Sequence, residues 1–365
     1  MGELSLPKTP LDLQSLPSPG LLVFPERIQN NINRMLTQVG GDPARLRPHV
    51  KTHKMSEVVG MQVASGITQF KCATLYEARM TAQAGGLDIL LAYPQVGPNV
   101  AGFLELQNEF PDVQFSTLVD NPLTLRAFTD SKQPVSLFVD IDCGMGRTGI
   151  APGPEAIQLC QTIHASSQLH FAGLHIYDGH IHQTDLAERT EAFETSLSSW
   201  QPMISQLEES GIQPPTIVTG GSPTFGLFSQ HTWQCSPGTT LLWDAGYSHA
   251  HTDLDFEVAA LLLTRVVSRP GRDRICLDLG HKAVAAENPL ACRVVFPDLP
   301  DAKPISQSEE HLVMETHSAE NLPPGTPLLG IPWHICPTVA LHARAHIIRE
   351  DAATDEIWAV DARDR

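Results

Sequence analysis

Positive charge is scarce in this chain. Lysine and arginine together number 24, against 41 aspartates and glutamates, and the formal net charge is -17 at pH 7. A protein that binds nucleic acid needs a basic surface to neutralise phosphates, and an anionic membrane surface attracts the same kind of patch. The composition therefore predicts that neither nucleic acid nor a membrane surface is a partner.

Long apolar runs and a cysteine framework are also missing. No stretch approaches the roughly 20 apolar residues of a membrane span. The proline-rich segment 1–19 lacks the basic start and apolar run of a secretory signal, so we expect a cytoplasmic protein. The cysteines are odd in number and scattered, which predicts reduced thiols rather than disulfides. They are Cys72, Cys143, Cys160, Cys235, Cys276, Cys292 and Cys336.

What the chain does have is a regular alternation of short apolar runs with helix-length segments over residues 22–245. Near-continuously apolar runs are typical of a parallel sheet buried on both faces. Eight units in about 220 residues predict an α/β domain, a closed (β/α)8 TIM-type barrel, with an open doubly wound sheet as the alternative. The expected strands are 46–51, 69–73, 88–93, 114–119, 135–141, 169–176, 216–219 and 239–243. The expected helices are 25–39, 75–84, 100–109, 122–130, 154–166 and 185–209.

Beyond residue 245 the pattern changes to short runs split by proline, glycine and charge. This texture predicts a second, mainly antiparallel β domain over residues 246–365, with which residues 1–21 are expected to pack. The expected strands lie at 256–267, 274–279, 293–296, 311–315, 327–331 and 345–348.

An unusual basic octamer, Arg-Pro-His-Val-Lys-Thr-His-Lys, occupies residues 47–54 of this acidic chain. A solvated basic loop is one interpretation. If the segment is extended, however, His49, Lys51 and His53 share one face and Lys54 points to the other. A lysine flanked by imidazoles can have a pKa low enough for its amine to act as a nucleophile, which is the chemistry of a Schiff-base lysine.

Glycine-rich turns follow two of the expected strands. The turn at 219–224 contains Thr219, Gly220, Gly221 and Ser222, and its backbone N–H groups could hold an anion, although a simple tight turn is the alternative. Gly238 and Thr239 could complete this cradle. The segment 144–149 matches G-x-G-x-x-G, but prolines follow at once and no acidic residue ends the next strand. We interpret it as a turn that presents Arg147 rather than a dinucleotide-binding loop.

The tripeptide 334–336, His-Ile-Cys, lies in the expected β domain. An imidazole and a thiolate that share a face suit Zn²⁺, and two protein ligands would leave open positions for water or substrate. A core cysteine beside a satisfied histidine is the alternative, and the tripeptide alone favours it.

Five segments, taken in chain order, resemble the D-threonine aldolase / D-serine dehydratase family, which belongs to the alanine-racemase-like fold of pyridoxal phosphate (PLP) enzymes. They are the octamer at 47–54, Ile-Asp-Cys-Gly-Met-Gly-Arg at 141–147, Gly-Gly-Ser at 220–222, Ser-Pro-Gly at 236–238 and His-Ile-Cys-Pro-Thr at 334–338. The resemblance covers nearly the whole chain. It implies a PLP-binding barrel and a β domain that carries a divalent metal, zinc by preference and manganese or magnesium otherwise, in a protein that is usually a homodimer.

The resemblance also implies roles for individual residues. Lys51 would carry the cofactor, Arg147 would lie near its phenolic oxygen, and the glycine turns would hold its phosphate. Tyr177, which closes the sixth expected strand, is a further candidate for binding the cofactor. His334 and Cys336 would bind the metal, which reverses the interpretation from the tripeptide alone. The candidates for proton transfer are His49, His53 and His180.

Two reactions on a D-3-hydroxy amino acid are compatible with this resemblance. Retro-aldol cleavage, as in D-threonine aldolase, gives glycine and an aldehyde, whereas dehydration of D-serine or D-3-hydroxyaspartate gives a keto acid and ammonia. Cysteine at position 336 is typical of the dehydratases, but the segment 177–180 is closer to the aldolases. We favour the aldolase reaction. A PLP-binding protein without catalysis is a minor alternative.

Overall fold

The chain forms two compact units in a computed structural model, which describes residues 13–131 and 133–364. We call the first the barrel unit; its described residues include 35–51 and most of 59–238. The second, the β unit, comprises the described residues 13–34, 52–58 and 239–363. The domain boundaries expected near residues 22 and 245 stay a prediction.

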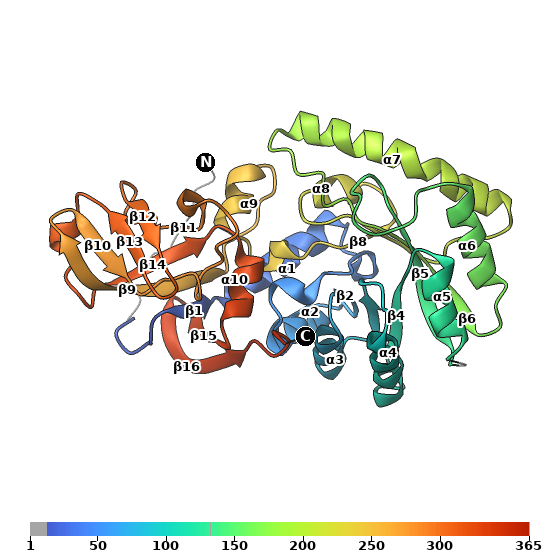
Figure 1. The fold of residues 1–365 in the computed structure, drawn as a ribbon, viewed down its shortest axis with the longest axis horizontal. Coiled ribbons are helices and arrows are strands. Elements are labelled where there is room, and N and C mark those ends of the chain that lie inside the picture. Colours follow the sequence, from blue (N-terminus) through green and yellow to red (C-terminus); the bar gives the residue numbers. More distant parts are fainter. Residues whose placement is uncertain (1–12, 132, 365) are drawn as a thin grey trace. The chain divides into compact units, whose positions relative to one another are not determined.

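The barrel unit is built on a parallel sheet in which every strand pairs with the next along the chain (Figure 1). Leu90, Leu118, Phe138, Ala172 and Val218, one from each of five neighbouring strands, pack in one apolar cluster. This layered filling is typical of TIM-type barrels. The strands are β2 (Gln69–Cys72), β3 (Asp88–Leu91), β4 (Gln114–Val119), β5 (Val135–Ile141), β6 (Leu169–Ile176), β7 (Ile217–Thr219) and β8 (Gln234–Cys235).

Helices connect these strands and pack beside them, as α3 does on β2 and β3 and α6 does on β5 and β6. Their starts carry local signals: the side chains of Thr74, Asn121 and Asp185 each accept a backbone N–H of the first turn. The helices are α3 (Leu75–Gln83), α4 (Pro98–Glu109), α5 (Pro122–Thr129), α6 (Pro154–His164), α7 (Leu186–Glu209) and the short α8 (Phe225–Phe228). A further helix, α2 (Ser56–Ala64), spans both units.

The first expected strand, 46–51, is wrong in detail. Leu46 makes a parallel bridge to Cys235 on β8, and His49 makes one to Lys71 on β2, so this segment lies between β8 and β2 without forming a regular strand. Pro48 has no N–H to give to a ladder, and a 3-10 helix, Val50–Thr52, begins directly afterwards. The alternation of side chains assumed for residues 49–54 therefore does not apply.

The last expected strand of the barrel, 239–243, is also wrong. These residues begin with a 3-10 helix, Thr239–Leu241, and continue to Trp243 with a left-handed backbone (φ 52°). The strand at this point of the barrel unit is instead the short β8, which pairs with β7. Within the described residues the parallel sheet thus has seven strands, and the expected α/β barrel with a β domain is confirmed as the fold class.

The β unit contains a mixed, mainly antiparallel sheet. The long strand β9 pairs antiparallel with β1, β10 and β14, and β1 also pairs parallel with β15 (Figure 1). The strands are β1 (Gly20–Val23), β9 (Ala260–Gly271), β10 (Arg274–Leu277), β11 (Val294–Val295), β12 (Lys303–Gln307), β13 (Leu312–Glu315), β14 (Pro327–Pro332), β15 (Arg344–Arg349) and β16 (Ala352–Ala359). The associated helices are α9 (Ala245–Ala250), α10 (Ile335–Leu341) and the start of α1 (Pro25–Gln38).

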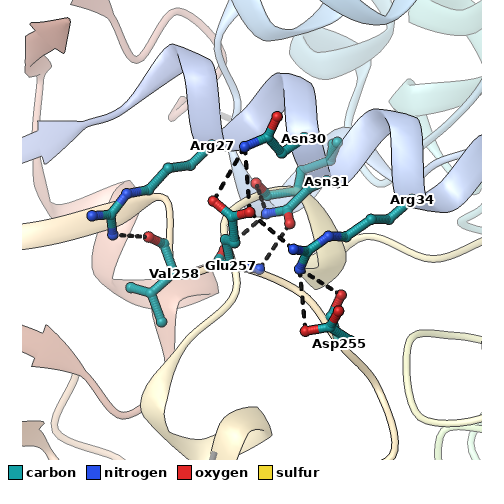
Figure 2. A network of polar contacts seen from close by, with 8 residues as sticks. Arg27, Asn30, Asn31, Arg34, Asp255, Glu257 and Val258 are labelled. Carbon is teal, nitrogen blue, oxygen red and sulfur yellow. Dashed lines mark hydrogen bonds and ion pairs between the residues drawn. The ribbon is translucent and has the colours of Figure 1, made fainter. Parts of the chain in front are cut away.

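Polar contacts join the start of α1 to the segment 255–258 of the same unit (Figure 2). The buried Asn31 makes two of them, donating to the carbonyl of Glu257 and accepting the N–H of Glu257, each at 2.8 Å; it also donates to the carbonyl of Leu241 at 3.1 Å. Arg27 donates to the carbonyl of Val258, and Arg34 pairs with the Glu257 carboxylate. One helix face therefore satisfies the backbone of a segment that has no regular structure.

No helix in the part of the chain that the structure describes combines the length and apolarity needed to cross a membrane.

Candidate functional site

Three cationic side chains of the barrel unit surround the ring of Tyr177, which follows β6. The Arg147 guanidinium lies 5.0 Å from the ring centroid, Lys71 Nζ 5.2 Å and Lys51 Nζ 5.8 Å. Lys51 comes from the segment that bridges β8 and β2, Lys71 from β2, and Arg147 from the loop after β5. Residues far apart in the sequence thus place three positive charges around one aromatic ring.

Two buried carboxylates lie in the same part of the barrel unit. His175 Nδ1 and Asp140 Oδ1 are 2.7 Å apart, and Thr148 donates to the other oxygen of Asp140. Burial alone would raise the pKa of Asp140, but the His175 hydrogen bond and charge lower it below its usual value. Burial lowers the pKa of His175, so the pair is an ionised carboxylate that accepts the Nδ1–H of a neutral imidazole.

The second carboxylate, Asp178, accepts a hydrogen bond from Thr224 at 3.1 Å. Burial raises the pKa of Asp178 to about 7. Asp178 Oδ2 and His175 Nε2 are both buried, and neither has a hydrogen-bond partner among the described residues. Buried polar atoms without partners are rare in native proteins, so these two atoms are candidates for contact with a polar ligand.

A glycine turn follows β7, where the sequence predicted an anion cradle. Gly220 has a φ of +66°, and a Cβ at this position would meet the Phe228 ring at 2.5 Å. A Cβ at Gly221 would meet Tyr177 at 3.1 Å, so the turn passes close to the aromatic ring. The Gly238 N–H donates to the Ser222 hydroxyl at 3.2 Å, which joins the two predicted parts of the cradle within the barrel unit.

Thr219 and Thr239, the remaining predicted members of the cradle, stay predictions, and each makes a further contact. The Thr219 hydroxyl donates to the carbonyl of Gln234, which fastens β7 to β8. Thr239 belongs to the β unit, where its hydroxyl lies 3.6 Å from Cys336 Sγ.

The residues of the barrel unit fit PLP. The pocket has an amine that can form a Schiff base (Lys51), an aromatic face (Tyr177) and a guanidinium (Arg147). The glycine turn, where Gly220 cannot carry a side chain without a clash, is suited to a phosphate. The unpartnered Asp178 and His175 atoms could meet polar groups of the cofactor or substrate.

The three candidate proton carriers lie in different surroundings. His49 Nδ1 accepts the N–H of Lys51 at 3.3 Å, so this imidazole is beside the predicted cofactor lysine. His180 lines an open cavity of about 660 Å³ together with Asp142, Gly144 and residues of α7. His53 is fully buried in the β unit, and desolvation lowers its pKa to about 3. The structure therefore places His49 beside Lys51.

The two predicted metal ligands come together at the start of α10 in the β unit. His334 is hydrogen-bonded to Cys336, and its Nδ1 lies 2.6 Å from Glu287 Oε1. Burial alone would lower the pKa of His334, but the bonds to Cys336 and Glu287 and the charge of Asp244 raise it to about 9. Asp244 also accepts the N–H of Ile335 at 3.0 Å, which fixes the backbone between the two ligands.

This donor set fits a divalent metal such as zinc. An imidazole directed at a thiol, with the other ring nitrogen on a carboxylate, is the usual arrangement around a metal-binding histidine. In the described ranges, however, no group of three or more histidine, cysteine, aspartate or glutamate side chains is placed to hold a metal ion. Positions for non-protein ligands would therefore remain open.

Sequence reasoning missed several residues of these two groups. Lys71 and Asp178 belong to the barrel group, whereas Glu287 and Asp244 belong to the group around His334. A signal was present for Lys71, because a lysine between Phe70 and Cys72 interrupts a run that must be buried. Glu287 had none, because it lies in an irregular segment far from His334 in the sequence.

Comparison with known proteins matches two successive segments of the chain to two family models. The family model "Alanine racemase, N-terminal domain" matches residues 23–245, more than half of the chain, and a serine dehydratase domain model matches residues 259–348. The chain belongs to the alanine racemase N-terminal domain family. Within it, the second domain places the chain among relatives that include D-threonine aldolase, 3-hydroxy-D-aspartate aldolase and D-serine dehydratase.

Individual relatives match over almost their full length. The D-threonine aldolase of an Arthrobacter species is 30% identical, over 96% of this chain and 94% of that protein. The D-serine dehydratase of Schizosaccharomyces pombe is 24% identical, over 95% of this chain and 92% of that protein. The crystal structure of D-threonine aldolase from Filomicrobium marinum superimposes with a TM-score of 0.86 at 26% identity, covering 96% of this chain and 97% of that one.

Proposed function

We propose that this protein is a PLP- and metal-dependent lyase that cleaves a D-3-hydroxy amino acid into glycine and an aldehyde, as a D-threonine aldolase does. The observation that carries the proposal is the Tyr177 group of Lys51, Arg147 and the unpartnered His175 and Asp178 atoms, in a chain that resembles a D-threonine aldolase from end to end. The family consists of PLP-dependent enzymes, which supports an amino acid as substrate.

The barrel unit would hold the cofactor through residues of different kinds. Lys51 would bind it covalently, Tyr177 would offer its ring face, and Arg147 would offer a positive charge. Gly220, Gly221, Ser222 and Gly238 are the candidates for the phosphate position; the glycine N–H groups donate to Ile176, Thr224 and Ser222, and the Ser222 hydroxyl would be a donor to the phosphate. When bound, PLP supplies an electron sink for the pair released at the substrate Cα.

The hydrogen bonds of His175 and His49 indicate which ring nitrogen of each imidazole would accept a proton and which would donate one. The Nδ1–H of His175 is held by Asp140, so its Nε2 is an acceptor for a ligand N–H or O–H. The Nδ1 of His49 accepts the Lys51 N–H and is therefore the unprotonated ring nitrogen, which leaves Nε2–H as the donor of a neutral ring. His49 and His180 remain the candidates for proton transfer to and from substrate.

His334 and Cys336 would hold the divalent metal, with Glu287 fixing the imidazole from its far side. The metal would act as a Lewis acid that polarises a hydroxyl group. Thr52 Oγ1 lies 3.1 Å from Cys336 Sγ, and a hydrogen bond from it would stabilise the thiolate form that binds metal. The resemblance further predicts a homodimer.

Dehydration is the second candidate, and Cys336 favours it. The family resemblance associates cysteine at this position with dehydratases, and the fission-yeast D-serine dehydratase matches the chain over its length. A dehydratase acting on D-serine or D-3-hydroxyaspartate would release a keto acid and ammonia. A PLP-binding protein without catalysis is the remaining, minor alternative.

One assay separates these functions. The protein, loaded with PLP and Zn²⁺ or Mn²⁺, is incubated with D-threonine, D-serine and D-3-hydroxyaspartate, and both product pairs are measured. We expect glycine and acetaldehyde from D-threonine. Keto acid and ammonia without glycine would establish the dehydratase instead, and no turnover of any substrate would favour the binding protein. L-Threonine and the Lys51→Ala variant are the matched controls.

A further inference from the structure

Lys71 is a buried lysine that the proposed mechanism does not use. Its side chain is 2% exposed, on β2, between two fully buried neighbours. Within the described residues its ammonium group faces the Tyr177 ring, whose centroid lies 5.2 Å from Nζ. A buried ammonium group loses its proton more easily than an exposed one, so an anionic ligand beside Nζ would stabilise the charged form.

Charged groups of both signs act on Lys71. Lys51 and Arg147 add positive charge, and Asp140 and Asp178 add negative charge. Asp140 is already engaged by His175 and Thr148, and Asp178 accepts the Thr224 hydroxyl. Both oxygens of Asp140 are therefore engaged, whereas Asp178 Oδ2 has no hydrogen-bond partner in the described residues, and three basic side chains face the Tyr177 ring.

We propose that Lys71 is a second functional lysine of this pocket, which forms no covalent bond to the cofactor but supplies the positive charge that holds an anionic oxygen of the bound ligand. The inference rests on the proposed PLP site in the barrel unit. The oxygen belongs either to the cofactor, as its phenolate, or to the carboxylate of the amino acid, and both present the same chemistry to an ammonium group.

The binding of an anion at Lys71 should then be coupled to the uptake of a proton by this side chain. Burial, with Lys51 and Arg147, lowers the pKa of Lys71 to about 7, while Asp178 and Asp140 act in the opposite direction. An anion bound at Lys71 would raise that pKa. The free protein therefore takes up a proton at Lys71 when it binds the anion above about pH 7, and this contribution to affinity is present below that pH and falls as the pH rises through it.

The test uses 4′-deoxypyridoxine 5′-phosphate, which keeps the phenol and the phosphate but has no aldehyde to react with either lysine. It is titrated calorimetrically into the cofactor-free full-length protein at about pH 6 and about pH 8.5, in buffers of different ionisation enthalpy. The wild type should show proton uptake at the higher pH. Lys71→Met should bind about 10- to 100-fold more weakly at the lower pH.

Lys71→Arg separates charge from structure, because arginine stays protonated across this range. We expect it to bind the analogue and to lack the proton uptake, so the wild-type-minus-arginine difference isolates the titration of Lys71 from that of the analogue. If Lys71→Met does not fold, this difference still decides the proposal. Lys303→Met, on the exposed strand β12, is the control and should match the wild type.

A second arm identifies the anion. The PLP-loaded variants are titrated with D-alanine, which has the carboxylate but no hydroxyl to cleave, and followed by the visible spectrum. Weakened analogue binding assigns the oxygen to the cofactor, and weakened D-alanine binding alone assigns it to the substrate. Unchanged affinity and proton uptake in both arms would overturn the proposal. Neither arm measures lyase activity, so failure of the proposed reaction is a separate result.

Discussion

At the residue scale, three lysines of this chain show how surroundings decide the chemistry of one side chain. Lys51 is partly exposed beside Tyr177, Lys71 is buried in the same group, and Lys54 donates from Nζ to the carbonyl of Ala362 in the β unit. Lys54 also has a left-handed backbone (φ 56°). The octamer therefore contains one lysine suited to a reactive role and one whose ammonium group fastens the end of the chain.

This difference predicts which lysine binds the cofactor. Lys51→Ala should lose the visible absorbance band of bound PLP and reduce lyase turnover by about 1000-fold or more, because no other amine would replace the covalent link. Lys54→Ala, the matched control, should keep the band. Borohydride reduction followed by peptide mass spectrometry should place the cofactor on Lys51. An unchanged band in Lys51→Ala, or cofactor found on Lys71, would contradict the assignment.

At the element scale, the expected strands agree with the observed ones where the hydrophobic pattern of a strand continues from one turn signal to the next. The expected strands 114–119, 135–141 and 169–176 agree with β4, β5 and β6 because each is an apolar run bounded by turn residues. The segments 46–51 and 239–243 have similar composition but form bridges and 3-10 turns. In the first, Arg47 is held by Asp88 and Gln234, contacts between distant elements that no local pattern reveals.

The contact between α1 and segment 255–258 also gives a prediction at this scale (Figure 2). Asn31→Leu would leave the carbonyls of Leu241 and Glu257 and the N–H of Glu257 buried without partners, and should lower the free energy of unfolding by about 3 kcal/mol. Asn33→Leu, on the exposed side of the same helix, should change it by about 0.5 kcal/mol or less. Urea unfolding followed by circular dichroism measures both; equal effects would show that the network contributes little.

At the scale of the whole molecule, the two units carry different candidate groups. The barrel unit contains the PLP candidates around Tyr177, and the β unit contains His334 and Cys336. We therefore expect the barrel unit to bind PLP, and the β unit to bind the metal, each through its own side chains.

Metal removal should therefore abolish the reaction without releasing the cofactor. A strong chelator is expected to reduce turnover about 100-fold or more, since Lewis-acid polarisation contributes several kcal/mol to such reactions, while the visible band of bound PLP persists. Zn²⁺ or Mn²⁺ should restore activity in the wild type but not in a His334→Ala, Cys336→Ala double variant. Turnover that is insensitive to the chelator would remove the metal from the mechanism.

The sequence by itself determined the alternation of strands and helices, the presence of a second, mainly β domain, and motifs that pointed to Lys51, Arg147, His334 and Cys336. These are local properties, set by apolar periodicity and by a few residues in fixed order. Only the tertiary structure decided that Lys71 joins Lys51 and Arg147 at Tyr177, with Asp178 and His175 interacting electrostatically with Lys71, and that Glu287 meets His334. The physical reason is that burial and charge depend on neighbours distant in sequence, which no local pattern specifies.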